Sequence, residues 1–156
     1  MTHGVSLSVE IQQGTAYRAN ARVTASAFEG GYLGGITNIG SDLSLDGSRV
    51  TGVQAQASDG AFGDGLDVVV SSTPATATIT GSRVEGSARA GIASFGAPVS
   101  VAATALSCNM VDLDGETYRN TDAAFDDGGG NTCGCDNNVI ACEVLSSGLM
   151  PPSQVP

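Results

Sequence analysis

The sequence has no tryptophan, no lysine and a single histidine, and aromatic residues make up only 4% of its 156 residues. Its core must therefore be built from alanine, valine, leucine and isoleucine, which fill narrow spaces. No run of eighteen apolar residues is present, so we expect no membrane-spanning helix. The 22 glycines, together with many serines and threonines, favour short strands and turns over long helices. The length suits one domain.

Positive charge is also scarce, since six arginines face sixteen acidic residues and the formal net charge is −10. A field of this sign repels phosphate groups, so we expect no nucleic-acid partner and no membrane insertion. The first fourteen residues, MTHGVSLSVEIQQG, lack the charged and apolar regions of a signal peptide. The chain is therefore expected to be either cytosolic or a piece of a longer exported protein.

The clearest signal is an internal repeat. LDGSRVTG at residues 45–52 returns as ITGSRVEG at residues 79–86, and four segments share the same spacing of apolar and hydroxyl residues. These are Ala21/Val23/Ser26/Phe28, Leu43/Leu45/Ser48/Val50, Ala77/Ile79/Ser82/Val84 and Val99/Val101/Thr104/Leu106. They begin 22, 34 and 22 residues apart, which indicates a 22-residue period with one insertion of twelve.

A second marker, glycine followed by an aliphatic residue, occurs at Gly35-Ile36, Gly65-Leu66 and Gly91-Ile92. Its distance from the preceding segment places about eight inserted residues within residues 53–65 and four more within residues 68–76. A small residue also follows the first three segments, at Gly30, Gly52 and Gly86, and Cys108 takes that position in the fourth.

Alternation of apolar and polar residues within each segment predicts strands with one buried face. Three short strands and three turns fit into about 22 residues, and stacking such units pairs each strand with its equivalent in the next unit. The stack should contain three inward columns, which are Ala21/Leu43/Ala77/Val99, Val23/Leu45/Ile79/Val101 and Phe28/Val50/Val84/Leu106. A hydroxyl column, Ser26/Ser48/Ser82/Thr104, should lie at a corner that Ala25/Gly47/Gly81/Ala103 keeps small.

This pattern resembles the right-handed parallel β-helix repeat of pectate-lyase-like proteins, clearly over residues 20–108 and faintly over residues 5–19. The resemblance implies an all-β, right-handed parallel β-helix (solenoid) of about four to five coils at residues 1–108. Residues 109–156 are expected to form a Cys-rich, acidic, irregular cap or tail tied by disulfides. The chain is also expected to begin within a coil, as a fragment of a longer β-helix protein. The coils of that longer chain would then stack against its first strands.

All four cysteines lie in the last third of the chain: Cys108, Cys133, Cys135 and Cys142. An even number in a segment rich in glycine, asparagine and aspartate is typical of two disulfides. A bond between Cys133 and Cys135 would close a very tight ring, so Cys108 should join one of them and Cys142 the other. A four-thiolate zinc site is the alternative, but zinc knuckles normally use C-x-x-C spacing. Disulfides favour a secreted or cell-surface location.

Two groups of residues are candidates for a ligand face. Arg49 and Arg83 stack in an outward column near Glu85, and the resemblance implies that such arginines act on acidic sugars beside calcium held by carboxylates. Exposed arginines beside a glutamate are, however, usually solvated ion pairs, which we expect here. The second group, Asp59, Asp64 and Asp67, lies in the inserted stretch with Phe62 but without tryptophan. Residues 63–67, GDGLD, resemble one calcium-binding repeat, yet such sites need tandem copies, so we interpret them as a loop.

Two classes of function remain. We expect a non-catalytic extracellular or cell-surface module, either structural or bound to polysaccharide or another cell-envelope component, with no metal or cofactor except calcium as a candidate. The alternative is a fragment of a pectate-lyase-like polysaccharide lyase or glycoside hydrolase. The hydrolase motifs of that family are missing, since the only histidine is His3 and Asp126-Asp127 lies outside the repeats.

Overall fold

The computed structural model describes residues 4–12 and 14–152, and strands are the regular structure throughout. In chain order the strands are β1 (Val5–Glu10), β2 (Asn20–Thr24), β3 (Ala27–Glu29), β4 (Gly34–Ile39), β5 (Asp42–Asp46), β6 (Arg49–Thr51), β7 (Asp64–Val69), β8 (Thr76–Thr80), β9 (Arg83–Glu85), β10 (Ala90–Phe95), β11 (Pro98–Ala102), β12 (Ala105–Ser107), β13 (Val111–Glu116), β14 (Ala124–Asp127), β15 (Cys133–Cys135), β16 (Asn138–Ile140) and β17 (Val144–Leu145). No helix occurs among the described residues, as a chain rich in glycine and β-branched residues predicts.

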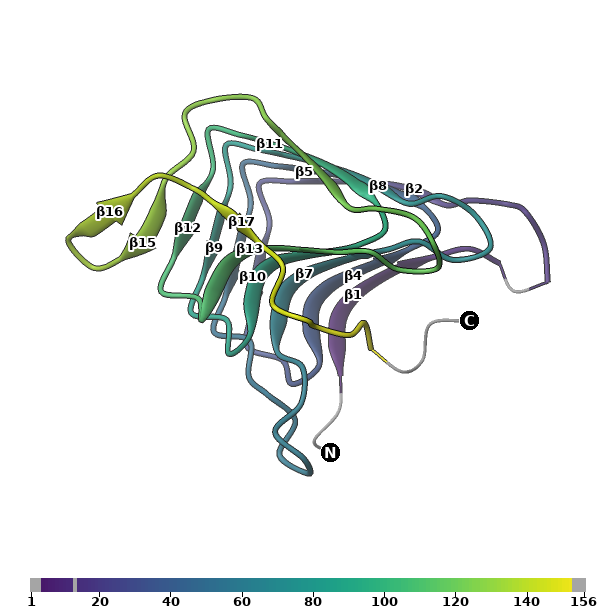
Figure 1. Ribbon diagram of the computed structural model, residues 1–156, viewed down its shortest axis with the longest axis horizontal. Helices are drawn as coiled ribbons and strands as arrows, with labels where there is room; N and C mark the ends of the chain where they lie inside the picture. The colour runs from purple at the N-terminus through teal and green to yellow at the C-terminus, as the bar shows by residue number, and fades with distance from the viewer. Residues whose placement is uncertain (1–3, 13, 153–156) are drawn as a thin grey trace.

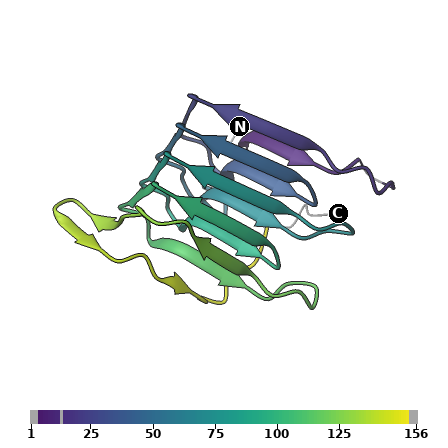
Figure 2. The same cartoon turned by 90° about the horizontal axis from the view of Figure 1, so that it is seen from above.

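The strands form three parallel sheets that enclose one interior (Figure 1). The six-stranded sheet has the order β1-β4-β7-β10-β13-β17, the five-stranded sheet β14-β11-β8-β5-β2, and the four-stranded sheet β12-β9-β6-β3. Up to β12, strands three apart in sequence are therefore neighbours, and Figure 2 shows them lying above one another. A short antiparallel pair, β15 and β16, extends from the end of the stack (Figure 1), where the Cys108 amide donates to the Gly134 carbonyl oxygen (2.9 Å) and joins β15 to the end of β12.

The register of the sheets confirms all three inward columns. Leu43 pairs with Ala21 on one side and Ala77 on the other, and Ala77 pairs with Val99. The same register aligns the Leu45 column, and the four-stranded sheet aligns the Val50 column. These side chains belong to one continuous buried core, which explains why a single repeat cannot fold alone.

The repeated Gly-Ser-Arg-Val forms the corner between the five- and four-stranded sheets. Gly47 and Gly81 have φ values of 56° and 55°, a left-handed conformation that glycine adopts without a steric penalty. The Ser48 amide donates to Ser82 Oγ (3.1 Å), and the Ser26 amide donates to Ser48 Oγ (3.1 Å). Each of the Ser48 and Ser82 hydroxyls in turn donates to the carbonyl two residues earlier. The predicted hydroxyl column is thus a hydrogen-bonded ladder between adjacent turns.

The insertion lies where the sequence predicts it. Twelve residues separate β6 from β7, whereas four separate β3 from β4 and β9 from β10. Six residues separate β7 from β8, whereas two separate β4 from β5 and β10 from β11. The extra residues therefore lengthen two turns and leave the register of the strands intact.

The strands continue past Cys108. β13 pairs with β10, β14 pairs with β11, and β17 pairs with β13, so the stack gains strands in two of its sheets. The sequence pattern missed them because the spacing changes here: Leu113 follows Leu106 by seven residues, whereas Ile92 follows Val84 by eight. The division of the chain at residue 108 remains a prediction.

Two disulfides tie the last third of the chain, one between Cys108 and Cys135 and one between Cys133 and Cys142. Both agree with the expectation that each outer cysteine joins one member of the C-x-C pair. No free cysteine occurs in the described chain, so the sulfurs are not available as zinc thiolates. The disulfides indicate an oxidising, extracellular type of environment. Among residues 4–12 and 14–152, no helix has the length and apolar character needed to cross a bilayer.

Candidate functional site

The fold separates the residues predicted to share a ligand face. Arg49, Arg83 and Glu85 lie on the four-stranded sheet, in β6 and β9, whereas Asp64 and Asp67 lie on β7 of the six-stranded sheet. The remaining residue, Asp59, is in the turn between β6 and β7 and is exposed. The six residues therefore do not form one site.

The two arginines of the four-stranded sheet are register neighbours and point to solvent. Arg49 pairs with Glu29 at 2.6 Å, and Arg83 pairs with Glu85 at 3.3 Å. The arginine side chains are 50% and 57% exposed, so water screens both pairs and each contributes little to stability. This arrangement agrees with the solvated ion pairs expected from the sequence.

The inserted stretch contains one turn and one buried strand. Asp59 Oδ1 accepts a hydrogen bond from the Ala61 amide (3.0 Å), which is a local turn contact. The interpretation of residues 63–67 as a loop is wrong, because residues 64–67 form the first part of β7 and are buried. The apolar residues on both sides of this short motif favour its burial in the sheet.

Asp64 forms a buried ion pair with Arg89. Arg89 Nε lies 2.8 Å and 3.0 Å from the two Asp64 carboxylate oxygens, Nη2 also contacts the carboxylate, and the Ala90 amide donates to Asp64 Oδ1 (2.9 Å). The Asp64 side chain is 0% exposed and that of Arg89 is 15% exposed. Burial alone would lower the pKa of Arg89, but the hydrogen bonds and charge of Asp64 outweigh it and raise that pKa. The guanidinium also lies 5.1 Å from the Phe62 ring centroid.

Asp67 is buried beside this pair, next to the Asp64 carboxylate and the hydroxyl of its register neighbour Thr37. Within the described chain, neither carboxyl oxygen of Asp67 makes a hydrogen bond of good geometry, and neither does the buried Thr37 hydroxyl. Burial, and then the charge of Asp64, raise the pKa of Asp67 well above its usual value. The sheet leaves room for these groups through Gly34, where a Cβ atom would lie 3.0 Å from Asp67 Oδ2 and 3.1 Å from Thr37 Oγ1.

The chain's own C-terminal segment, residues 146–152, binds the acidic groups farther along this sheet. The Ser147 amide donates to Asp114 Oδ1 (3.0 Å), and the amides of Gly148 and Leu149 donate to Glu116 Oε1 (2.6 Å and 3.1 Å). Burial raises the pKa of Asp114. Burial would also raise the pKa of Glu116, but the donors from the segment outweigh it and lower that pKa. Figure 1 shows the segment following β17 and passing the strands of this sheet.

Arg89 completes the contact, since its Nη1 donates to the Met150 carbonyl oxygen (3.0 Å). Pro151 and Pro152 are buried. Sequence reasoning missed Arg89, Asp114 and Glu116 as members of one cluster. The available signal was their place relative to the aliphatic marker of each repeat, because Arg89 precedes Ile92 by three residues and Asp114 follows Leu113 directly.

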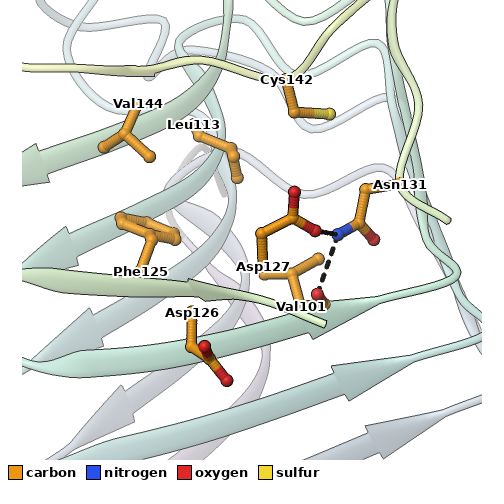
Figure 3. Close-up of a pocket in the computed structure, with 8 residues that line it drawn as sticks. All are labelled: Val101, Leu113, Phe125, Asp126, Asp127, Asn131, Cys142 and Val144. Carbon is orange, nitrogen blue, oxygen red and sulfur yellow. Dashed lines mark hydrogen bonds between the residues drawn. The ribbon is translucent and has the colours of Figure 1, made fainter. Parts of the chain in front are cut away.

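A small pocket lies where the core ends beside β14 and β17 (Figure 3). Its volume is about 80 Å³, whereas pockets for small-molecule ligands are usually about 300 to 1,000 Å³. Asn131 closes one side by donating to Asp127 Oδ1 (2.6 Å) and to the Val101 carbonyl oxygen (2.8 Å). The pocket is therefore the unfilled end of the core and is too small for a sugar chain.

The structure gives little support to a metal site. In the described part of the chain, the one cluster of three potential ligand residues is Cys108, Cys135 and Asp136. Its two sulfurs are joined in a disulfide, so they are not thiolate ligands. Calcium was only a candidate at Asp64 or Asp67, and Arg89 already occupies the Asp64 carboxylate.

Comparison with known proteins returned no match to a family model, a curated protein or a solved structure. The likeness to pectate-lyase-like proteins therefore depends on the repeat in this sequence, with which the stacked parallel sheets are compatible.

Proposed function

We propose that this chain is a right-handed parallel β-helix that serves as a non-catalytic, secreted or cell-surface module. The observation that carries the proposal is the pairing of equivalent strands from successive repeats in three sheets around one core. Such a stack is stabilised by contacts between neighbouring repeats and supplies a rigid, elongated body. The two disulfides support a location outside the reducing cytosol.

A non-catalytic role is supported by the burial of the carboxyl groups and the arginine that could act as acid, base or charge-stabilising groups. Asp64, Asp67 and Asp114 are each 0% exposed. Arg89 is held between Asp64 and the C-terminal segment, and a general acid or base must reach the proton that it transfers. A sugar cannot reach carboxyl groups that are fully buried.

Polysaccharide, or another polar cell-envelope component, is the partner that we propose for the module. The outer face of the five-stranded sheet supports this choice, because Arg22, Ser44, Thr78 and Ser100 follow one another in register as a polar column. The column continues to Asp126 on β14, and its hydroxyl, guanidinium and carboxyl groups match the hydrogen-bonding groups of an extended sugar chain.

The test is incubation of the purified, oxidised protein with neutral and acidic polysaccharides, with and without calcium. We expect no unsaturated or shortened products. Retention of the protein on at least one polysaccharide would support a binding module, and absence of retention would support a structural one. Product formation would contradict the non-catalytic role.

One observation favours the alternative, a polysaccharide lyase. Asp64 and Asp67 lie on β7, and Arg89, in the turn before β10, pairs with Asp64; the family resemblance implies an arginine beside carboxylates that hold calcium. Calcium-dependent release of unsaturated sugars that is lost in Arg89→Ala, but retained in Arg83→Ala, would favour this alternative. Loss in Arg83→Ala alone would instead place the chemistry on the four-stranded sheet.

A further inference from the structure

The outer face of the six-stranded sheet, opposite the main core, combines a polar and an apolar strip. Thr37, Asp67 and Asp114 lie along the polar strip, with Ala93 between the two aspartates in register. The apolar strip adjoins it and is a second hydrophobic cluster of Ile39, Val69, Ala90 and Phe95, to which Ala93 also belongs. The C-terminal segment lies over both strips, since Ser147 contacts Asp114 and Leu149 packs on the apolar cluster.

The segment is held mainly through its main chain. Four consecutive residues use backbone groups: the amides of Ser147, Gly148 and Leu149 donate to carboxylates, and the Met150 carbonyl accepts from Arg89. Every residue other than proline carries these groups. Gly148 has a φ of 72°, so the segment turns here and the amides of Gly148 and Leu149 meet at one Glu116 oxygen. The charged side chains of the sheet therefore bind mainly a turned backbone rather than a particular sequence.

Two side chains of the segment also make contacts, and the first is the Ser146 hydroxyl, which donates to Glu116 Oε2 (3.0 Å). Leu149 packs against the apolar cluster, whereas the neighbouring Met150 is 64% exposed. One apolar anchor on a main-chain clamp is a common way to bind short peptides.

The resident segment leaves the polar strip unsatisfied. In the described part of the chain, both Asp67 oxygens, Asp114 Oδ2 and the Thr37 hydroxyl are buried without a hydrogen bond of good geometry. The neighbours of the two aspartates are largely acidic, since Asp67 lies beside Asp64 and Asp114 lies beside Glu116. Buried polar atoms normally have partners, and leaving a carboxyl without donors is costly. The sequence of the segment, SSGLMPP, contains no charged donor. An ammonium group offers three donors and a guanidinium five, so a basic side chain would supply what this face lacks.

The charge of this face also favours a basic ligand. Four carboxyl groups, those of Asp64, Asp67, Asp114 and Glu116, line the face against the single cation of Arg89. The net charge of the whole chain is −10, so its long-range field also attracts cationic ligands.

From these observations we propose that the outer face of the six-stranded sheet binds a peptide segment carrying a basic side chain, and that the C-terminal segment is its displaceable occupant. The proposal concerns a different face from the polysaccharide surface above and does not depend on it. Binding of the basic group would favour the ionised form of Asp67, so the complex should release a proton.

The experiment uses the full-length oxidised chain and its Leu149→Asp variant, in which a charge replaces the apolar anchor of the segment. Hydrogen exchange should show protected Gly148 and Leu149 amides in the parent and loss of that protection in the variant. Retained protection would overturn the proposal, because the occupant would not be displaceable. Circular dichroism and a cooperative thermal transition control for folding, and Leu149→Ser replaces the variant if it does not fold.

The probes are a capped SSGLMPP peptide and three peptides with one lysine in place of its second serine, its methionine or its first proline. Isothermal titration calorimetry should show that at least one lysine peptide binds the variant at least tenfold more tightly than the SSGLMPP peptide does. The same lysine peptide should bind the parent at least tenfold more weakly than it binds the variant. Matched glutamate peptides should not bind, and heats in buffers of different ionisation enthalpy should report proton release. Equal affinity of the lysine and glutamate peptides, or binding of calcium alone without any peptide, would overturn the proposal.

Discussion

The corner ladder leads to a quantitative prediction for Ser82. This residue is 5% exposed, its hydroxyl accepts from the Ser48 amide (3.1 Å), and it donates to the Thr80 carbonyl (2.8 Å). Replacing Ser82 by leucine removes both hydrogen bonds and adds volume to a closely packed turn. An unsatisfied buried donor and an overpacked site together should lower the free energy of unfolding by about 2 to 4 kcal/mol.

The matched control is the neighbouring residue. The Arg83 side chain is 57% exposed and has one ion pair at 3.3 Å, so Arg83→Ser should lower the free energy of unfolding by less than about 1 kcal/mol. Ser82→Ala separates the two causes, because it removes the hydrogen bonds without adding volume and should cost about 1 to 2 kcal/mol.

Urea denaturation of the oxidised proteins, followed by far-ultraviolet circular dichroism, measures all three variants. For a domain of this size the leucine variant should also melt roughly 4 to 16 °C below the parent. Equal losses in Ser82→Leu and Arg83→Ser, or the reverse order, would refute the assignment of inward and outward faces and with it the register of the stack.

Three further predictions test the interior, the disulfides and the buried acid. Gly65→Ala should lower the free energy of unfolding by about 1 to 3 kcal/mol, because its Cβ would lie 2.4 Å from a valine methyl group. The control, Gly52→Ala, meets no atom within 4 Å and strains only a φ of 67°, so equal losses in urea denaturation would contradict this reasoning. Removing the Cys108 disulfide, which spans 27 residues, should cost about 3 to 4 kcal/mol, and removing the Cys133 disulfide, which spans nine, about 2 to 3 kcal/mol; free thiols in the denatured, unreduced parent would contradict both. The pKa of Asp67 is raised in the folded protein. Its stabilising contribution is therefore complete below the unfolded pKa of about 3.9 and is lost as the pH rises through the folded pKa. Asp67→Asn should accordingly gain stability relative to the parent between pH 4 and pH 7, and an unchanged difference in urea midpoint would refute it.

Much of the strand arrangement follows from the sequence alone because the contacts repeat with the sequence. In stacked parallel sheets, each residue lies beside the equivalent residue of the next repeat. The spacing that aligns Leu45 with Ile79 in the sequence therefore also identifies them as neighbours in the five-stranded sheet. An insertion in a turn does not change this, since the strands on both sides keep their own spacing.

The same logic explains where the prediction stopped. Beyond Cys108 the marker glycine is replaced by Asp112, and Leu113 comes one residue early. A change of one residue removes the periodic signal, although the strand still pairs with β10 because main-chain hydrogen bonds do not depend on side-chain identity.

The candidate site was decided by the tertiary structure. Asp59 and Asp64 look alike in the sequence, yet one is exposed in a turn and the other is buried against Arg89. Arg89 reaches Met150 across 61 residues, a contact that no period encodes. Composition and repeat spacing predicted most of the strands before Cys108, their register and the presence of two disulfides, because these depend on local pattern and on equivalence between repeats. The buried charges and the segment that covers them depend on a single, non-repeating contact between distant parts of the chain, so only the folded structure could place them.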